Sequence, residues 1–115
     1  MTTDIDKGIK TDEPSNLAKW ILMAEQGSAK FQNKLGSIYA DGDGVTQCYE
    51  TALAWFTLAA EQGLDVAQNN LASMYDNGEG TPKNVQTAFE WYLLAANQGY
   101  ALAQVSLGVL YAKGE

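Results

Sequence analysis

The sequence predicts an all-α fold, an α-solenoid built from antiparallel helix pairs, on three observations. The first is a repeat of about 36 residues, because AEQG ends at Gly27 and Gly63 and its variant ANQG ends at Gly99. A period in this range is typical of helical repeat proteins. The second is that apolar residues recur at the three- and four-residue spacing of amphipathic helices. The third is a glycine at the expected helix ends, where a left-handed C-terminal cap favours glycine.

Many positions keep this step along the chain. They hold leucine, tyrosine, glutamine and tryptophan, and they include Leu35, Leu71 and Leu107; Tyr39, Tyr75 and Tyr111; Gln32, Gln68 and Gln104; and Trp55 and Trp91. So many matches at one step indicate duplication of one structural unit.

The elements follow in order from the N-terminus. Residues 1–14 carry charges and no apolar stripe, and they are expected to form a disordered N-terminal tail. Residues 15–27 align with the second half of a repeat and predict a single helix, for which Ser15 is the expected N-cap. Residues 28–63 and 64–99 are two full units, and residues 100–115 are the first half of another.

Each full unit is expected to contain two helices, here named A and B. In the first unit, helix A is expected near residues 29–41 and helix B near residues 49–62, each with apolar residues on one stripe. Gly42 and Gly63 follow these two helices and are expected to end them. The second unit repeats the pattern, so the predicted order is B, A-B, A-B, A.

Composition excludes several classes of protein. The chain of 115 residues is 46% hydrophobic, enough for one packed domain, and has a net charge of -7 with neither Arg nor His. Its charge has the wrong sign for nucleic acid or an anionic membrane. Without His there are no imidazole-based catalytic or zinc sites, and the single Cys48 cannot form an internal disulfide. We therefore predict no enzyme, cofactor or metal site.

The location is predicted from absences in the sequence. The first ten residues lack the apolar core of a signal peptide, and no later apolar run is long enough to span a bilayer. A cytoplasmic location is the default expectation. An exported or periplasmic form whose signal has been removed would have the same sequence.

The segment YADGDGV, residues 39–45, offers two chemical interpretations, a calcium loop or a phosphate cradle. A calcium loop of the EF-hand type would need an oxygen ligand at Val45 and a glutamate at Ala52, and neither is present. A phosphate loop would follow a strand, whereas this segment follows a predicted helix. The two glycines recur in YDNGEGT of the next unit, so they are predicted to turn helix A into helix B.

The repeated pattern resembles the Sel-1-like repeats, a subclass of the tetratricopeptide-type helical repeats. The residues that carry the resemblance are Leu35-Gly36, Tyr39, Gly42-x-Gly44-Val45, Ala52, Trp55-Phe56, Ala59-Ala60 and Gly63, and it covers about residues 16–114. The chain departs from the family at the start of helix B, where Cys48 and Asn84 replace an aspartate. The resemblance implies a right-handed stack with A helices lining a concave surface, in scaffolds and adaptors that are often bacterial.

A partner-binding groove is the functional site that this resemblance implies. Its lining would come from A-helix positions off the Leu and Tyr stripe, which are Lys30, Asn33, Lys34, Ser37, Val66, Asn69, Asn70, Ser73, Leu102, Val105, Ser106 and Val109. Asparagine can both donate to and accept from a peptide backbone, although the same residues also suit a solvated helix face. A clamp for a C-terminal carboxylate is not expected, because Leu102 and Ser106 replace its later cation.

The last predicted helix leaves an alternative function open. Leu102, Val105 and Val109 add apolar area that no following helix B covers, which predicts truncation of a longer array or self-association. The tryptophans and repeated tyrosines are expected to pack between helices. The leading hypothesis is a protein-protein interaction module or scaffold, part of an adaptor, regulatory or immunity-type protein. The alternative is an architectural segment that self-associates through its C-terminal helix.

Overall fold

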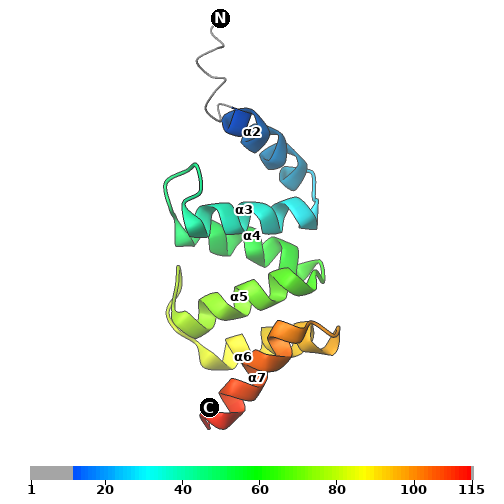
Figure 1. Ribbon diagram of the computed structural model, residues 1–115, viewed down its shortest axis with the longest axis vertical. Coiled ribbons are helices and arrows are strands. Elements are labelled where there is room, and N and C mark those ends of the chain that lie inside the picture. The colour runs from blue at the N-terminus through cyan, green and yellow to red at the C-terminus, as the bar shows by residue number, and fades with distance from the viewer. Residues whose placement is uncertain (1–11, 115) are drawn as a thin grey trace, which may run out of the picture.

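The computed structural model describes residues 12–114, which fold into an elongated stack of helices measuring 59 × 22 × 21 Å (Figure 1). This part of the chain contains six helices and no strand, which confirms the predicted all-α solenoid of helix pairs. The helices are α2 (Asp12–Glu25), α3 (Ala29–Asp41), α4 (Tyr49–Glu61), α5 (Asp65–Asn77), α6 (Val85–Asn97) and α7 (Ala101–Ala112).

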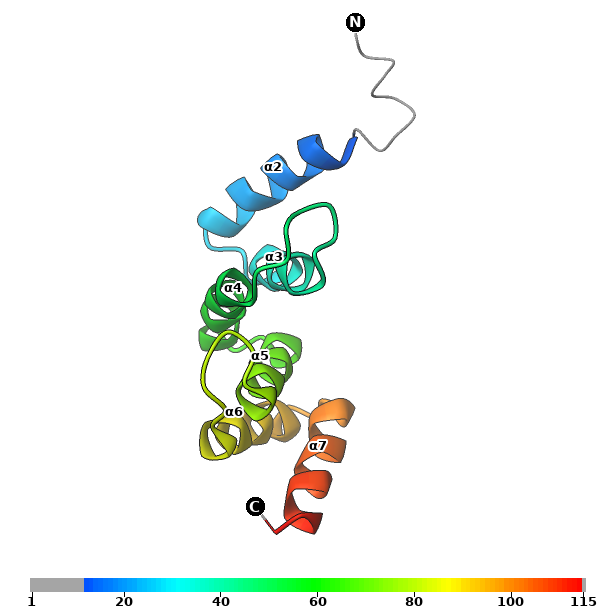
Figure 2. The same ribbon diagram turned by 90° about the vertical axis from the view of Figure 1, so that its left-hand side faces the viewer.

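Successive helices pack against one another along the stack. We call α3, α5 and α7 the A helices and α2, α4 and α6 the B helices. Figure 2 shows the A helices along one side of the stack and the B helices along the other. Each A helix therefore has one side chain row facing its B neighbours and another facing away from them.

The helix ends are fixed by local hydrogen bonds. Gly42 and Gly78 end α3 and α5 in the left-handed conformation, with φ of 68° and 71°, as the sequence predicts. Ser28 caps the start of α3 by accepting a hydrogen bond from the Phe31 backbone N–H at 3.3 Å. Asn84 caps α6 in the same manner, so this departure from the family pattern still supplies a cap.

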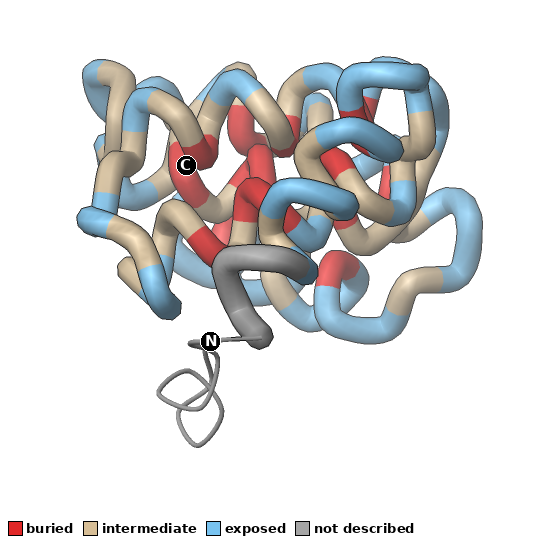
Figure 3. Tube along the Cα trace, turned by 90° about the horizontal axis from the view of Figure 1, so that it is seen from above, coloured by how far each residue is buried: buried red, intermediate tan, exposed pale blue. Residues whose placement is uncertain are grey.

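The core lies between the two rows of helices, as the buried segments in Figure 3 show. Leu35 and Leu71 are fully buried at their shared repeat position. The third leucine of that row, Leu107, is only half-buried, and Leu110 on the same helix is buried in its place. The difference arises because α7 is packed by a B helix on one side only within the described residues.

Two predictions at the N-terminus and one at the C-terminus need correction or restriction. Helix α2 begins at Asp12, so Ser15 lies inside the helix and the prediction that it is the N-cap is wrong. Of the predicted tail, residues 1–11 lie outside the described residues. Tyr111 is 66% exposed and meets Phe89 of α6 edge to face, so the predicted packing of the repeated tyrosines between helices is partial there, whereas Tyr39 and Tyr75 pack against the core.

Candidate functional site

The predicted groove positions fall on all three A helices. On α3 and α5 the lysines are exposed and the other residues are half-buried, which applies to Asn33, Ser37, Val66, Asn69, Asn70 and Ser73. On α7 Leu102, Val105 and Val109 are exposed, and Ser106 is half-buried. The surface thus changes along the stack from cationic to neutral polar to apolar.

Two asparagines of this surface are brought together across the repeat boundary. Asn70 Nδ2 donates a hydrogen bond to Asn33 Oδ1 at 3.1 Å, which joins α5 to α3. Beside them, Asn69 Oδ1 is buried and accepts no hydrogen bond from the described residues. A buried acceptor without a hydrogen bond destabilises the folded chain by about 1–3 kcal/mol relative to a satisfied one. Buried polar atoms are nearly always satisfied, so this one calls for an explanation.

The two lysines of α3 lie over aromatic rings. Lys34 Nζ is 4.4 Å from the centroid of the Trp20 ring on α2, and Lys30 Nζ is 5.5 Å from that of Phe31. Both distances are within the range of a cation–π contact. The ammonium groups are therefore held at the N-terminal end of the surface, and that of Lys34 also helps to join α2 to α3.

Two of the predicted serines have a structural partner that the sequence did not reveal. Ser106 and Ser73 lie beside the hydroxyl group of Tyr92, a buried residue of α6. Burial raises the pKa of Tyr92, the two serine hydroxyl groups oppose that rise, and the charge of Asp76 adds to it. The repeat position of Tyr92 matches that of Phe56, which has no hydroxyl group, so this contact could not be predicted from the repeat pattern.

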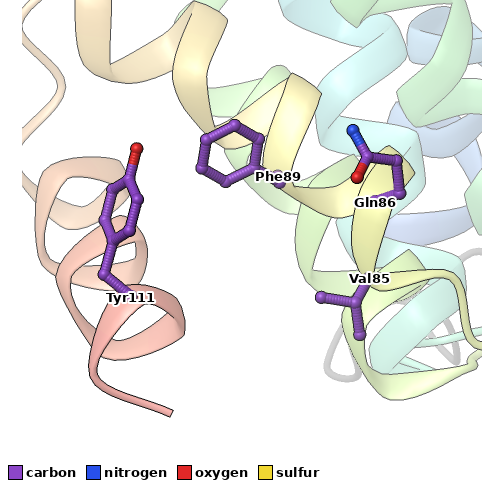
Figure 4. Close-up of a pocket in the computed structure, with 4 residues that line it drawn as sticks. All are labelled: Val85, Gln86, Phe89 and Tyr111. Atoms are coloured by element: carbon purple, nitrogen blue, oxygen red, sulfur yellow. The ribbon is translucent and has the colours of Figure 1, made fainter. Parts of the chain in front are cut away.

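A hollow in the surface lies elsewhere, between α6 and the end of α7. It has a volume of about 350 Å³ and is lined by Val85, Gln86, Phe89 and Tyr111 (Figure 4). The Phe89 and Tyr111 rings meet edge to face, with centroids 5.7 Å apart and planes at 87°. None of these four residues belongs to the predicted groove, so the apolar hollow is a separate feature of the C-terminal end.

The described residues offer little for catalysis or metal binding. Among residues 12–114, no three His, Cys, Asp or Glu side chains are arranged to hold a metal ion. The glycines of the segment YADGDGV adopt left-handed conformations in the turn between α3 and α4. In the same range no helix combines the length and the apolar character needed to cross a membrane.

Comparison with known proteins identifies the repeat. A sequence profile of the Sel1 repeat matches residues 29–64 and 65–100, which together make up more than half of the chain. The chain belongs to the Sel1 repeat family. The matched ranges are offset by one residue from the two units predicted above. Sel1 repeat proteins are generally helical modules for protein–protein interaction.

Solved Sel1 structures are similar to this chain. A Sel1 repeat protein from Oxalobacter formigenes is 40% identical with a TM-score of 0.75, over 77% of this chain and 37% of that protein. A protective antigen present in uropathogenic Escherichia coli strains, which displays an SLR fold, is 39% identical with a TM-score of 0.81, over 83% of this chain and 20% of that protein. A comparison with curated proteins gives no match. The chain therefore spans a minor part of the length of these Sel1 relatives.

Proposed function

We propose that this chain is a non-enzymatic interaction module that binds an extended segment of a protein partner along its A helices. The observation that carries the proposal is the row of amides formed by Asn33, Asn69 and Asn70. A peptide backbone presents alternating N–H donors and C=O acceptors, and asparagine offers both complements.

The buried oxygen of Asn69 supports this role. The Asn69 residue is half-buried, so a change of its side-chain torsion angles that turns the whole amide outward would present the unsatisfied acceptor to a ligand. A backbone N–H of the partner would then satisfy it. The cost that the free protein carries at Asn69 would be recovered on binding, which gives a reason for a polar residue at that position.

The change in character along the surface supports an orientation for the partner. Lys30 and Lys34 lie at the α3 end of a chain whose net charge is -7, and the α7 end is apolar through Leu102 and Val105. An acidic residue of the partner should lie near α3 and apolar side chains near α7. This pattern defines the chemistry of the partner segment, not its identity.

A selection from a displayed library of random peptides would test the proposal. Peptides selected on the wild-type chain should be enriched in acidic and apolar residues, and should bind the Asn33, Asn69 and Asn70 to Ala variant at least about tenfold more weakly. Gln86→Ala on α6 is the matched control, because it removes an exposed amide from a B helix. Equal binding to the wild type and the triple variant would overturn the assignment.

A stability measurement separates binding from folding. Asn69→Ala removes a buried oxygen that has no partner, so it should weaken peptide binding without lowering the free energy of unfolding. Asn70→Ala breaks the bond to Asn33 and is expected to cost about 0.5–1.5 kcal/mol. If Asn69→Ala instead destabilised the chain and left binding intact, Asn69 would be a structural residue.

A further inference from the structure

The outward side of the B helices carries a row of leucines. Leu22, Leu58 and Leu94 occupy one repeat position on α2, α4 and α6, and they are 55%, 46% and 49% exposed. Figure 2 shows these three helices along one side of the stack. A single exposed leucine is ordinary, whereas exposed leucines that recur at one position form a patch of the kind that marks an interaction site.

The exposure of this row belongs to the repeat unit itself. Helix α4 packs against α3 and α5, and helix α6 packs against α5 and α7. Leu58 and Leu94 are therefore exposed although their helices already have an A helix on each side. The A helices bury other positions of α4, such as Ala52 and Phe56, and leave the leucine position uncovered.

Two half-buried tryptophans lie beside the leucines. Trp55 is three residues before Leu58 and Trp91 is three residues before Leu94, a spacing that makes them neighbours on one side of the helix. Trp55 packs against a cluster that contains Ala24 of α2, and Trp91 packs against a cluster that contains residues of α4. Each tryptophan thus reaches toward the preceding B helix, so apolar surface connects one leucine to the next.

Carboxylates border the leucines. Each leucine of the row has an exposed glutamate three or four residues away on its own helix, which is Glu25 for Leu22, Glu61 for Leu58 and Glu90 for Leu94. Residues at this spacing are neighbours on one helix face. We call the three leucines, the two tryptophans and the three glutamates the outer surface.

The charge of the outer surface is negative on two of its three helices. Helices α4 and α6 contain no lysine, and the chain has no arginine. Glu90 accepts a hydrogen bond from the neutral amide of Gln86 at 3.4 Å, which leaves its charge in place. On α2 the exposed Lys19 lies three residues before Leu22, so the border is most negative on α4 and α6.

The outer surface is suited to recognise side chains and not a peptide backbone. The backbone groups in the middle of a helix are bonded within the helix, and leucine offers no hydrogen bond. A narrow apolar row with negative borders complements an apolar stripe with positive borders, which is the pattern of a cationic amphipathic helix. A second copy of the chain would instead bring glutamates against glutamates, which disfavours self-association through this surface.

We propose that the outer surface binds an amphipathic helix of a partner protein, one whose apolar stripe is bordered by lysine or arginine. The apolar side chains of that helix pack on Leu58 and Leu94, and its cations lie beside Glu61 and Glu90. The contact is centred on α4 and α6, where the border is most negative. It does not rest on peptide binding along the A helices, because the outer surface and the predicted groove share no residue.

Binding of three designed peptides, measured by fluorescence anisotropy, tests the proposal. The first is a helix of about 20 residues with leucine at every third or fourth position and lysine on both sides of that stripe. The second has glutamate in place of lysine, and the third has the composition of the first in scrambled order. The lysine helix should bind the wild-type chain at least about tenfold more tightly than either of the others.

Two double variants of the chain locate the contact. Leu58→Ser combined with Leu94→Ser keeps every charge and should weaken binding of the lysine helix at least about tenfold. Glu61→Gln combined with Glu90→Gln should weaken binding at low salt, and the loss should shrink as salt is added, because salt screens exposed charges. All four sites are exposed, and circular dichroism checks that both variants fold.

Variants of the A helices are the controls. Leu102→Ser combined with Val105→Ser removes two exposed apolar side chains from α7, and it should bind the lysine helix like the wild type. The Asn33, Asn69 and Asn70 to Ala variant should also bind it like the wild type. Failure of peptide binding along the A helices would therefore leave these results unchanged, and the two proposals can fail separately.

Tryptophan emission provides a second readout of where the lysine helix binds. Because the designed peptides contain no aromatic residue, a Trp20→Phe chain reports on Trp55 and Trp91 alone. Their emission should shift to shorter wavelength on binding, since the peptide removes water from their exposed edges. Binding without such a shift would place the peptide away from the outer surface.

Three further results would overturn the proposal. One is equal binding of the lysine helix to the wild type and to the serine variant of Leu58 and Leu94, which would mean attraction by the net charge of -7 alone. Another is equal binding of the lysine and glutamate helices to the wild type. The third is a loss of binding in the α7 control with none in the serine variant of α4 and α6, which would place the partner helix on the A helices.

Discussion

Gln62 Nε2 lies 2.8 Å from Gln32 Oε1, and this bond links the end of one B helix to the A helix of the same unit. Gln32 Nε2 in turn donates to the carbonyl oxygen of Ala24 in the last turn of α2. The same carbonyl oxygen accepts from the Gly27 backbone N–H at 3.0 Å, so the side chain adds a second hydrogen bond at the end of α2. The glutamines therefore tie three consecutive helices together at one edge of the stack.

The variant Gln68→Leu tests the strength of this network. Gln68 is 4% exposed, donates to Ala60 at 3.2 Å and accepts from Gln98 at 2.9 Å, so leucine removes two hydrogen bonds. We expect the free energy of unfolding in urea to fall by about 1–3 kcal/mol. Gln104→Leu is the control at the same repeat position, where the side chain is exposed and makes one bond. It should cost less than about 1 kcal/mol, and equal losses would show that the network adds no stability.

Much of the fold could be predicted from the sequence because each repeat has the same pattern of apolar residues and helix-ending glycines. The step between Leu35 and Leu71 fixed the register, and the glycines at 42 and 78 fixed where the A helices end. The start of α2 at Asp12 was missed because Ser15 suits an N-cap while Pro14 also suits the first turn of a helix, and local rules do not rank the two possibilities. The exposure of Tyr111 was missed because it depends on which helices cover α7, not on the repeat pattern.

The candidate site was predictable only as a set of positions. The periodic glutamines were visible in the sequence, and the recurrence of Gln26, Gln62 and Gln98 in the AEQG and ANQG segments was the signal for their network. The bond between Asn33 and Asn70 could not be foreseen, because it depends on the distance between helices of different units. Side-chain contacts across a repeat boundary follow from three-dimensional packing, which one sequence does not determine.

The glycines Gly36 and Gly108 share a repeat position but should respond oppositely to alanine. At Gly36 a Cβ would lie 2.5–2.8 Å from three atoms of the Phe56 ring, so the ring must move and the chain should lose about 1–2 kcal/mol. At Gly108 the space is open, and alanine should gain about 0.5–1 kcal/mol from its higher helix propensity. Thermal unfolding of both variants at low concentration checks this. A gain at Gly36 as large as that at Gly108 would refute the close approach of Phe56.

Cys48 and Asn84 occupy the same N-cap position before α4 and α6 but differ in capping. Asn84 Oδ1 accepts from the Thr87 backbone N–H at 3.0 Å, whereas Cys48 makes no such bond. Cys48→Asn should therefore raise the free energy of unfolding by about 0.5–1 kcal/mol, and Asn84→Ala should lower it by about 1 kcal/mol. Urea titrations of the two variants check the pair. A loss of stability for Cys48→Asn would show that the contact of its thiol with the Thr51 hydroxyl matters more than a cap.

Tyr92 should make the stability of the chain depend on alkaline pH. Because burial raises its pKa above 10.0, the folded state keeps the proton when the unfolded state has begun to lose it. The stability that the raised pKa of Tyr92 contributes is fully present below the pKa that Tyr92 has in the unfolded chain. It is lost as pH rises through the pKa that Tyr92 has in the folded chain. Tyr92→Phe should be less stable than the wild type at pH 8 by about 0.5–1.5 kcal/mol, because it removes a hydroxyl group that has Ser73 and Ser106 as polar neighbours. Above pH 10 the difference between the two should shrink, as measured by urea unfolding across the range. A difference in unfolding free energy that stays constant at every pH would mean that Tyr92 ionises alike in the folded and the unfolded state. Tyr111→Phe, at an exposed site, is the matched control.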